Sequence, residues 1–336
     1  MSTVKSAHLP VGKLPGQLLA RLVGSYATTD PSVVVGPGIG GDAAAIDLGS
    51  TMLAVKSDPI TFASESPARY LVDVNANDLA CLGATPRWLM VTALLPQGTT
   101  EEDVERHFRE LRDACVQRGI SLVGGHTEIT FGLHRPILVG VLLGEVDADR
   151  LLRPGGARPG DRLLLTKAIA IEGTALVARE LGEHLRTELD PALVERAANF
   201  LADPGISVAD EAIALLDAGG VTALHDPTEG GLATGIRELA LAAGCGATID
   251  RNAVPVLPET SAIAGALGLD PLGMLASGSL LAAAQPDAVE RLVGLGLDVT
   301  PIGQLTEGDG FLLRADGDER ELPAYDSDET TRVLGN

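Results

Sequence analysis

A proline- and glycine-rich break near the middle of the chain decides which architectures are open to it. Leu152–Asp161 holds two prolines and three glycines between apolar segments that are typical of strands. On both sides of this break, strand-like and helix-like segments mix without strict alternation, which favours α/β and α+β architectures with a mixed sheet in each half. The 336 residues also suit two domains. We therefore expect an irregular arm over 1–30, domains over 31–150 and 151–315, and a solvated acidic tail over 316–336.

The charge balance restricts the partners of the chain. Aspartate and glutamate number 46 against 25 lysine and arginine residues, which gives a net charge of −21. Binding to nucleic acid or anionic lipid through charge requires the opposite balance, so both classes of partner are excluded. The sequence has no apolar run of about 18 residues and no signal-like N-terminal stretch, so we expect no membrane segment and a cytoplasmic location. Its three cysteines lack C-x-x-C spacing, which argues against a disulfide framework and a structural zinc site.

Hydrophobic periodicity predicts the secondary structure of both halves. In the first half we expect helices over Gln17–Val23, Ser66–Gly83 and Thr100–Arg118, and strands over Val33–Val35, Ala43–Leu48, Met52–Asp58, Trp88–Leu95, Ser121–Val123 and Pro136–Glu145. In the second half we expect helices over Gly173–Leu181, Pro191–Leu201, Val208–Ala218 and Gly231–Ala243, and strands over Arg162–Thr166, Ala223–His225, Ala247–Asp250, Leu275–Ala284, Val299–Leu305 and Phe311–Ala315. No internal repeat is evident, which argues against a repeat architecture.

The glycine pattern Gly36-x-Gly38-x-x-Gly41 matches the dinucleotide-binding fingerprint letter for letter. That motif requires a helix that begins at the third glycine, so that its N-terminal amides face a pyrophosphate. Here Asp42 and a strand-like stretch follow the third glycine, and Pro37 removes one amide donor. We therefore do not expect a dinucleotide site. Two interpretations stay open: a surface turn, or a loop that presents Asp42 to a metal ion.

Two segments of the first half place charged or polar side chains on defined faces. Lys56 and Asp58 are two residues apart on a predicted strand and share one side of it, as on an exposed sheet face or in a site that uses a cation beside a carboxylate. The helix over Ser66–Gly83 has one apolar stripe, with Asn75 inside it and Asp78 at its edge. Buried polar groups cost several kcal/mol unless they are paired or liganded. A satisfied buried network and a metal or ligand site both fit this helix.

Two glycine-rich motifs carry further candidate residues. Gly124–Glu128 follows a short apolar strand, so we expect His126 and Glu128 to emerge at its end on one side, where they suit a metal–phosphate cluster. His225–Gly231 lies between a predicted strand and a predicted helix. That position favours helix capping, and it also suits an anion site.

Five of these segments occur in the order found in the AIR synthase-related (PurM-like) superfamily. Gly41-Asp42-Ala43-Ala44 resembles the family's Gly-Asp-Asp-Ala-Ala loop with one aspartate missing, and Lys56-Ser57-Asp58 is similar to its Thr-Thr-Asp strand end. Asn77-Asp78-Leu79-Ala80 resembles its Asn-Asp-(Leu/Ile)-Ala helix, and Gly124-Gly125-His126-Thr127 stands where most members have Gly-Gly-Asp/Glu-Thr. Asp226–Gly231 resembles the Asp-Pro-Thr-Arg-Gly-Gly motif of HypE-type hydrogenase maturation proteins. The resemblance runs from about Val33 to Leu313.

The resemblance implies a two-domain PurM-like fold. Its N-terminal mixed-sheet domain would join that of a second copy in a dimeric barrel, and its C-terminal domain would be α+β. ATP and Mg²⁺ are the implied cofactors, with ATP in a groove near the dimer interface. The implied metal ligands are Asp42, Asp58, Asp78 and Glu128, the last as a substitute because His126 replaces an acid. Catalytic roles are implied for Asp78, His126 and Asp226, and nucleotide binding for Gly40, Gly41, Lys56, Asn77, Thr127 and Lys167.

The resemblance also implies an activity. We expect an ATP-dependent, Mg²⁺-requiring enzyme that phosphorylates a carbonyl or amide oxygen of a small or peptide-borne substrate, with a maturation partner protein among its expected partners. The alternatives are a thiamine-phosphate-type kinase and a nucleotide-binding regulatory homologue without turnover. HypE-type proteins end in a cysteine that receives a carbamoyl group, whereas this sequence ends in Val333-Leu334-Gly335-Asn336. That departure argues against a complete carbamoyl-dehydratase cycle on its own tail.

Overall fold

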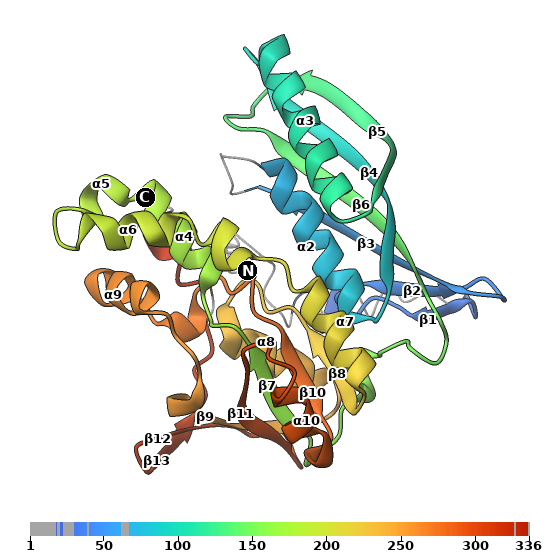
Figure 1. The fold of residues 1–336 in the computed structure, drawn as a ribbon, viewed down its shortest axis with the longest axis vertical. Helices are drawn as coiled ribbons and strands as arrows, with labels where there is room; N and C mark the ends of the chain where they lie inside the picture. Colours follow the sequence, from blue (N-terminus) through green and yellow to red (C-terminus); the bar gives the residue numbers. More distant parts are fainter. Residues whose placement is uncertain are drawn as a thin grey trace, which may run out of the picture.

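The computed structural model describes residues 30–38, 40–61, 67–325 and 327–334, together with Leu18, Arg21 and Leu22. Two mixed sheets, one from each half of the chain, form two layered domains (Figure 1). Apart from Asp30 and those three residues, the arm expected over 1–30 lies outside the described residues. Ser66, at the expected start of a helix, also lies outside them.

The N-terminal sheet has the strand order β1-β2-β3-β6-β4-β5. Its strands are β1 (Val33–Val35), β2 (Ala44–Asp47), β3 (Met52–Ile60), β4 (Thr85–Pro96), β5 (Ser121–Thr130) and β6 (Ile137–Val146). Neighbouring strands are antiparallel except β4 and β5, which run parallel and are joined by α3 (Glu101–Gln117). A capping box between Thr100 and Asp103 begins α3. α3 and α2 (Pro67–Cys81) cover one face of the sheet (Figure 1).

α2 lies between the N-terminal sheet and the C-terminal domain and is buried on nearly all sides. Arg69 is its one residue that is not buried. The sequence predicts a single apolar stripe, with Asp73 and Asn77 pointing elsewhere, but both are buried as well. The reason is that α3, α7 and the end of β8 pack around the helix and cover the sides that the N-terminal sheet leaves free.

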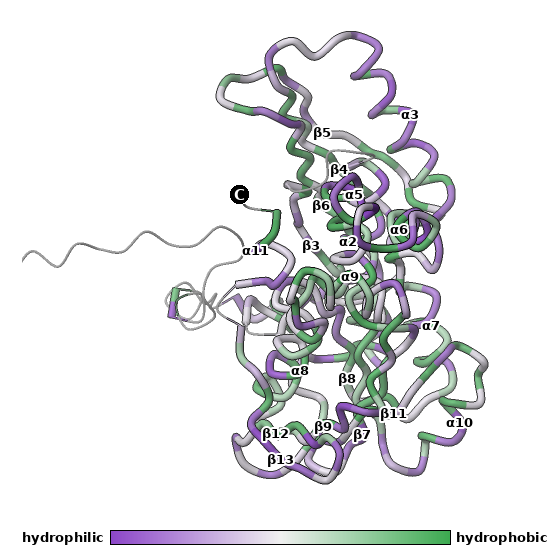
Figure 2. Tube along the Cα trace, turned by 90° about the vertical axis from the view of Figure 1, so that its left-hand side faces the viewer, coloured by the Kyte–Doolittle hydropathy of each residue, from purple (hydrophilic) through white to green (hydrophobic). Residues whose placement is uncertain are grey.

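The C-terminal sheet has the order β13-β12-β9-β11-β7-β10-β8 and is antiparallel except for the β9–β12 pair. Its strands are β7 (Arg162–Thr166), β8 (Val221–His225), β9 (Gly246–Asp250), β10 (Leu281–Ala284), β11 (Val299–Thr306), β12 (Phe311–Ala315) and β13 (Asp318–Glu321). The helices of this half are α4 (Ile171–Glu180), α5 (Gly182–Leu185), α6 (Pro191–Ala198), α7 (Ala209–Ala218), α8 (Gly231–Ala242), α9 (Pro258–Leu267), α10 (Val289–Val293) and α11 (Thr331–Leu334). Hydrophobic strands run through the middle of this domain (Figure 2).

The two domains share a hydrophobic core. The cluster formed by α2 and the N-terminal strands also takes in residues from the second half, namely Ile171, Ala175, Phe200, Leu201 and Ile206. The Pro/Gly-rich break lies at the junction, where the N–H of Leu152 donates to the carbonyl of Leu82 at 3.1 Å. Side chains on α2 are therefore positioned by both domains. Within the part of the chain that the structure describes, no helix has the length and apolar character that crossing a membrane requires.

The predicted fold class is confirmed, but two strand predictions are wrong. The strand expected over Ser121–Val123 continues to Thr130 as β5, so Gly124–Glu128 lies within a strand rather than at its end. Parallel pairing with β4 continues as far as Thr130, and this pairing overrides the turn tendency of two successive glycines. The strand expected from Leu275 begins only at Leu281.

The expectation of a solvated tail is correct for β13 and wrong for the residues that follow. All of β13 is exposed, whereas Asp328, Glu329 and Thr330 are buried. The carboxylate of Asp328 accepts the backbone N–H of Gly230 at 2.8 Å and that of Leu275 at 3.2 Å. The end of the chain therefore packs on the loop that precedes α8.

Candidate active site at the domain junction

Lys56, in the middle of β3, lies between two carboxylates. Its Nζ is 2.9 Å from Asp78 Oδ2 on α2 and 3.2 Å from Asp58 Oδ2 on its own strand. Lys56 and Asp58 share the face of β3 that α2 covers, because residues two apart on a strand point to the same side. The side chain of Asp78 is 6% exposed, whereas that of Asp58 is 34% exposed. The three residues thus form a charged cluster that is open to solvent on one side.

Asn75 holds the end of β3 against α2. Its Oδ1 accepts the backbone N–H of Asp58 at 3.1 Å, and its Nδ2 donates to the carbonyl of Leu71 at 2.8 Å. Gly140 on β6 leaves room for this amide, because a Cβ there would lie 2.8 Å from Asn75 Nδ2. Of the two interpretations that the helix pattern left open, Asn75 matches the satisfied buried network. Asp78 belongs to the charged cluster.

His225, at the end of β8, lies between two carboxylates from different parts of the fold. Its Nδ1 is 2.8 Å from Asp42 Oδ1, and its Nε2 is 3.1 Å from Glu238 Oε2 on α8. Burial on its own lowers the pKa of His225, but the two carboxylates outweigh burial and raise the pKa to about 10. His225 is therefore an imidazolium at neutral pH, and it donates to both carboxylates.

Gly40, two residues before Asp42, lies against α8. Gly40 has a φ of +66°, and a Cβ at this position would lie 2.6 Å from the carbonyl oxygen of Glu238. Only glycine combines this backbone conformation with so close an approach. The loop therefore presents Asp42, as one interpretation of its sequence held, but it presents the carboxylate to His225.

Asn77 joins α2 to the C-terminal domain. Its Nδ2 donates to the carbonyl of Ile206 at 2.9 Å and to Asp226 Oδ2 at 3.0 Å. Its Oδ1 accepts the N–H of Val208 at 2.9 Å. All three hydrogen bonds are buried, so Asn77 is committed to the domain junction and has no N–H donor to spare for the phosphates of a nucleotide.

Asp226 differs from the other carboxylates of the site. Its Oδ1 is buried and has no hydrogen-bond partner among the described residues. Burial raises the pKa of Asp226 to about 8, against the hydrogen bond from Asn77, which lowers it. The carboxyl group therefore carries a proton at neutral pH, and that proton lies on an otherwise unpaired oxygen.

The aspartates of the first half do converge electrostatically. Burial raises the pKa of Asp78 well above its usual range, while Lys56 lowers it and Asp42 and Asp58 raise it further. Burial lowers the pKa of Lys56, but Asp78 and Asp58 outweigh burial and raise it overall. Asp42 and Asp58 are thus near enough to Asp78 to act on its charge. The cations that they contact are Lys56 and His225.

The β5 candidates do not reach this cluster within one chain. His126 Nε2 lies 3.1 Å from Glu128 Oε2, and both side chains are exposed. The register pairs His126 with Thr92, Val139 and Pro59 across β4, β6 and β3. His126 therefore faces the side of the sheet opposite to Asp58, which precedes Pro59 on β3.

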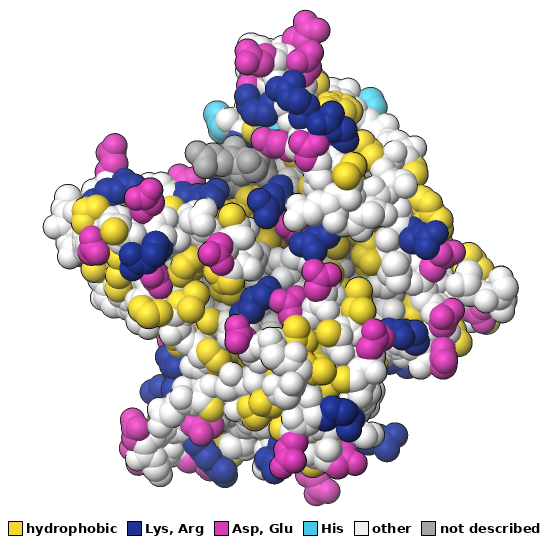
Figure 3. Space-filling view, viewed as in Figure 1, with side chains coloured by type: hydrophobic (Ala, Val, Ile, Leu, Met, Phe, Trp, Pro, Cys, Tyr) yellow, Lys and Arg dark blue, Asp and Glu magenta, His cyan; other side chains and the backbone are white. Residues whose placement is uncertain are grey.

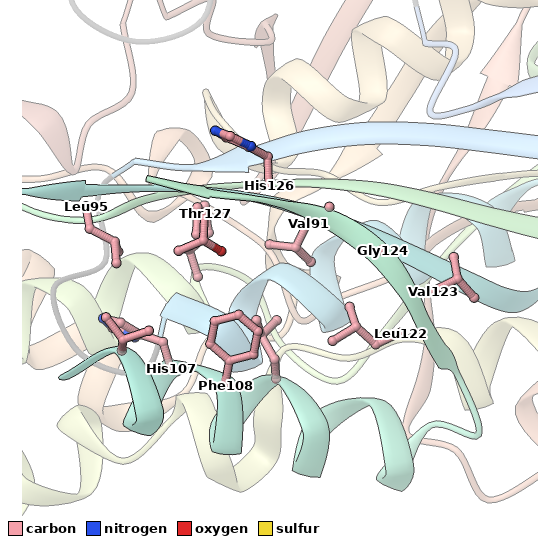
Figure 4. A pocket seen from close by; sticks show the side chains of 14 residues that line it. Val91, Leu95, His107, Phe108, Leu122, Val123, Gly124, His126 and Thr127 are labelled. Carbon is pink, nitrogen blue, oxygen red and sulfur yellow. The ribbon is translucent and has the colours of Figure 1, made fainter. Parts of the chain in front are cut away.

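Thr127 points the other way, into a cavity of about 400 Å³ between α3 and the sheet (Figure 4). The side chain of His126 points away from α3 in the same view (Figure 4). The described lining is largely apolar, as at Val91, Leu122 and Phe108, and contains no lysine or arginine. This cavity does not suit a triphosphate, so the nucleotide-binding role expected for Thr127 gains no support from it.

Lys167 follows β7 and pairs with the start of α7. Its Nζ donates to the carbonyl of Ser207 at 2.6 Å and lies 2.8 Å from Glu211 Oε1. These contacts direct the ammonium group to the C-terminal domain. The expected nucleotide role of Lys167 remains a prediction.

The donor set does not fit a divalent ion held by the protein alone. Within the described residues, no group of three Asp, Glu, His or Cys side chains is arranged to hold a metal ion. Asp58 and Asp78 contact Lys56, Asp42 contacts His225, and Glu128 contacts His126. The binding of Mg²⁺ by these four carboxylates therefore stays a prediction, and in a single chain their oxygens face cationic side chains or a histidine.

Sequence reasoning overlooked Glu238 and weighed His225 only within a capping motif. The pair comes together with Asp42 over a separation of 183 residues in the chain. The one local signal in the sequence is that His225 ends a strand and Glu238 lies two turns into the following helix. This signal does not identify Asp42 as the third partner.

The described geometry can now be set beside known proteins. Residues 40–146 match the family described as AIR synthase related protein, N-terminal domain, and residues 158–315 match the corresponding C-terminal domain. The carbamoyl dehydratase HypE of Cupriavidus necator is 31% identical over 261 residues, which cover 74% of this chain and 70% of that protein. The structure of hydrogenase maturation protein HypE in complex with ATP has a TM-score of 0.72 at 25% identity and covers 86% of this chain and 89% of that one. A HypE–HypF complex has a TM-score of 0.73 at 20% identity, with coverage of 91% and 99%.

The two matched families follow one another along the chain in the order of its two domains. The break at Leu152–Asp161 falls between the bulk of one match and the bulk of the other. The expected resemblance is confirmed: the chain belongs to the AIR synthase-related family and is similar to its HypE members.

Proposed function

We propose that this protein is an ATP-dependent enzyme that transfers the γ-phosphoryl group to the oxygen of a carbonyl or carboxamide, as a HypE-like dehydratase does. The observation that carries the proposal is the cluster at the domain junction. There the ammonium group of Lys56 pairs with Asp78 on α2, and the buried carboxyl group of Asp226 accepts a hydrogen bond from Asn77, the neighbour of Asp78 on that helix, in a chain similar to an ATP-bound HypE. ATP is the expected nucleotide, and Mg²⁺ enters with it as Mg–ATP, the substrate complex. Magnesium is commonly bound through substrate phosphates and few protein ligands.

The proposed chemistry has two stages. The carboxamide oxygen attacks the γ-phosphorus, the bond from that phosphorus to the β–γ bridging oxygen breaks, and ADP leaves. The oxygen of the resulting phosphorylated amide is now part of a good leaving group. Loss of phosphate together with the protons of the amide nitrogen then gives a nitrile. ATP and a carboxamide thus become ADP, phosphate and the dehydrated product.

The chain supplies charge and a proton site for these stages. Lys56 is a fixed positive charge that can neutralise phosphate oxygens, and its position is set by Asp78 and Asp58. Asp226 has a pKa of about 8 because it is buried, so it can exchange a proton near neutral pH. Asp58, with 34% of its side chain exposed, is the carboxylate that a bound Mg–ATP would meet first.

The test is an ATP turnover assay with candidate acceptors. Purified protein is incubated with Mg–ATP and either a primary carboxamide, a carbamoylated cysteine peptide or thiamine phosphate, and ADP and the organic product are quantified. We expect ADP formation with a carboxamide or the carbamoyl peptide, together with a nitrile or thiocyanate product. Asp226→Asn should reduce turnover strongly, whereas Asp217→Asn, in an exposed ion pair with Arg150, should not.

Two outcomes would contradict this proposal in different ways. Phosphorylation of thiamine phosphate alone would identify a small-molecule kinase. Tight nucleotide binding without turnover of any acceptor would identify a regulatory homologue.

A homodimer is part of the proposal. The face of the N-terminal sheet opposite α2 carries partly exposed hydrophobic side chains, among them Met90, which is 45% exposed. β5 is an edge strand, and its hydrophobic residues Val123 and Ile129 are each 55% exposed. Hydrophobic side chains are also visible on the right-hand side of the upper domain, the side on which β5 lies (Figure 3). An uncovered edge and an apolar sheet face are typical of surfaces that pair with another chain.

The dimer can be tested separately from the activity. Light scattering after gel filtration should give the mass of two chains for the wild type and of one chain for Ile129→Lys. A control substitution on the exposed part of α3, Val116→Lys, should leave the dimer intact. A monomeric wild type would contradict the proposed dimer without deciding the activity.

A maturation partner is the remaining part of the proposal. A HypE of this fold forms a complex with HypF, which supports a protein partner for this chain. Gel filtration of this chain mixed with a HypF protein tests this point. Separate elution of the two proteins at micromolar concentration would argue against it.

A further inference from the structure

The ammonium group of Lys56 occupies the centre of the acidic cluster. It contacts Asp78 at 2.9 Å and Asp58 at 3.2 Å, and the carboxylate of Asp42 also acts on its charge. The Lys56 side chain is 18% exposed and that of Asp78 only 6%. A cation is therefore already in place at the position where three aspartates approach one another.

A divalent ion at the same position would face two obstacles. It would lie within a few ångströms of a positive charge, and like charges at that distance repel one another by several kcal/mol even at the effective dielectric near a protein surface. It would also have to take oxygens from Lys56, because the Oδ2 atoms of Asp58 and Asp78 both contact the Nζ. Asp42 offers no replacement, since His225 holds its carboxylate.

The ion pairs with Asp58 and Asp78 require a lysine at position 56. A neutral residue at position 56 would leave Asp58 and Asp78 without the ion pair, and Asp78 is too buried to be neutralised by solvent. Two adjacent carboxylates without a counter-charge either take up a proton or bind a cation. Lys56 performs that neutralisation within the chain itself.

We propose that Lys56 is a built-in cation that replaces a protein-bound divalent ion in this cluster, so that the protein takes up a divalent ion only together with a nucleotide. The inference rests on the proposed function for the nucleotide alone, since the pairing of Lys56 with Asp58 and Asp78 is a contact of this chain itself. Lys56 therefore sets the metal requirement of the site: one positive charge comes from the protein, and the divalent ion comes with the phosphates.

The test measures Mn²⁺ binding in the absence of nucleotide, by the loss of the free Mn²⁺ signal in electron paramagnetic resonance. Five proteins are compared: wild type, Lys56→Ala, Lys56→Met, Lys56→Ala with Asp78→Asn, and Arg118→Ala. Arg118 is the matched control, because it pairs at 2.9 Å with Asp73, another buried carboxylate of α2 that lies outside the cluster. Lys56→Met serves as a second variant that preserves the volume of the side chain.

We expect no measurable binding of Mn²⁺ to the wild type without nucleotide. Lys56→Ala and Lys56→Met should bind Mn²⁺ at least about tenfold more tightly than the detection limit set by the wild type, because the repulsion of one charge is removed. The double variant and Arg118→Ala should bind no better than the wild type, since each lacks the pair of free carboxylates. The same pattern is expected in melting curves: added Mn²⁺ should raise the Tm of the Lys56 variants and leave that of Arg118→Ala unchanged.

Three results would overturn the inference. The first is a wild type that binds Mn²⁺ without nucleotide as tightly as the Lys56 variants. The second is a pair of Lys56 variants that gain no Mn²⁺ binding. The third is a pair of Lys56 variants that stay unfolded even with Mn²⁺ present, because a divalent ion should replace the lost ammonium. None of these results depends on turnover, so failure of the proposed enzymatic activity would be recognised separately in the ATP assay.

Discussion

The ion pair between Asp42 and His225 makes a quantitative prediction about stability and pH. The imidazole lies between Asp42 and Glu238, and its pKa is raised from 6.5 to about 10 in the folded protein. Above pH 6.5 the unfolded chain loses this proton while the folded protein keeps it. The stabilisation is therefore complete below pH 6.5 and is lost progressively as the pH rises towards 10.

The size of the effect follows from the shift. Each pH unit within this window changes the free energy of unfolding by about 1.4 kcal/mol for one proton. Between pH 6.5 and about pH 9, the wild type should therefore lose roughly 3 kcal/mol through His225 alone. Other groups also titrate over this range, so the loss must be measured against a variant that lacks this one titration.

The matched variant is Asp42→Asn with His225→Gln, which removes both charges and keeps side chains of similar shape. Urea unfolding of both proteins is followed by circular dichroism at several pH values from about 6 to 9. The difference in free energy of unfolding between them should shrink by roughly 3 kcal/mol over that range. Parallel stability curves for the two proteins would refute the assignment of a buried imidazolium to His225.

Three further substitutions test other parts of the site. Asp226→Asn should stabilise the fold by roughly 2–4 kcal/mol at about pH 8, as measured by urea unfolding. The raised pKa of Asp226 means that the stability of the wild type falls as the pH rises from about 4 to 8, whereas asparagine cannot ionise. Equal stabilities of the two proteins at about pH 8 would contradict this. Gly40→Ala should destabilise by about 1–3 kcal/mol, measured in the same way, because its Cβ would lie 2.6 Å from the Glu238 carbonyl oxygen. Asn77→Ala should cost roughly 3 kcal/mol by leaving the buried N–H of Val208 and carbonyl of Ile206 unpaired, and a normal Tm would show that water replaces these hydrogen bonds.

Much of the fold was predictable because the relevant signals are local. Three strands have the predicted bounds, namely Val33–Val35, Arg162–Thr166 and Phe311–Ala315, and most of the other predicted strands and helices are present with ends that differ by a few residues. Periodicity also identified the buried face of α2, with Asn75 inside it and Asp78 at its edge. Such patterns depend on neighbours within one or two turns, which the sequence displays directly.

The remaining features depend on packing between distant segments. Lys56 and Asp58 were known to share a strand face, but their pairing with Asp78 required the position of α2 over β3. The extension of β5 through two glycines required its parallel partner β4. Asp42 was expected at a metal ion, and the structure places it against His225, which no periodicity connects to it.

The three hydrogen bonds of Asn77 and the shared core have a consequence for how this chain can be divided. A fragment that ends at the Pro/Gly-rich break would expose α2 on the side that the second half covers, and the second half alone would lack the amide that pairs with Ile206 and Val208. Neither half is a self-sufficient unit. Evolution can therefore exchange these halves only as a matched set, and an expression strategy that separates them should yield aggregates.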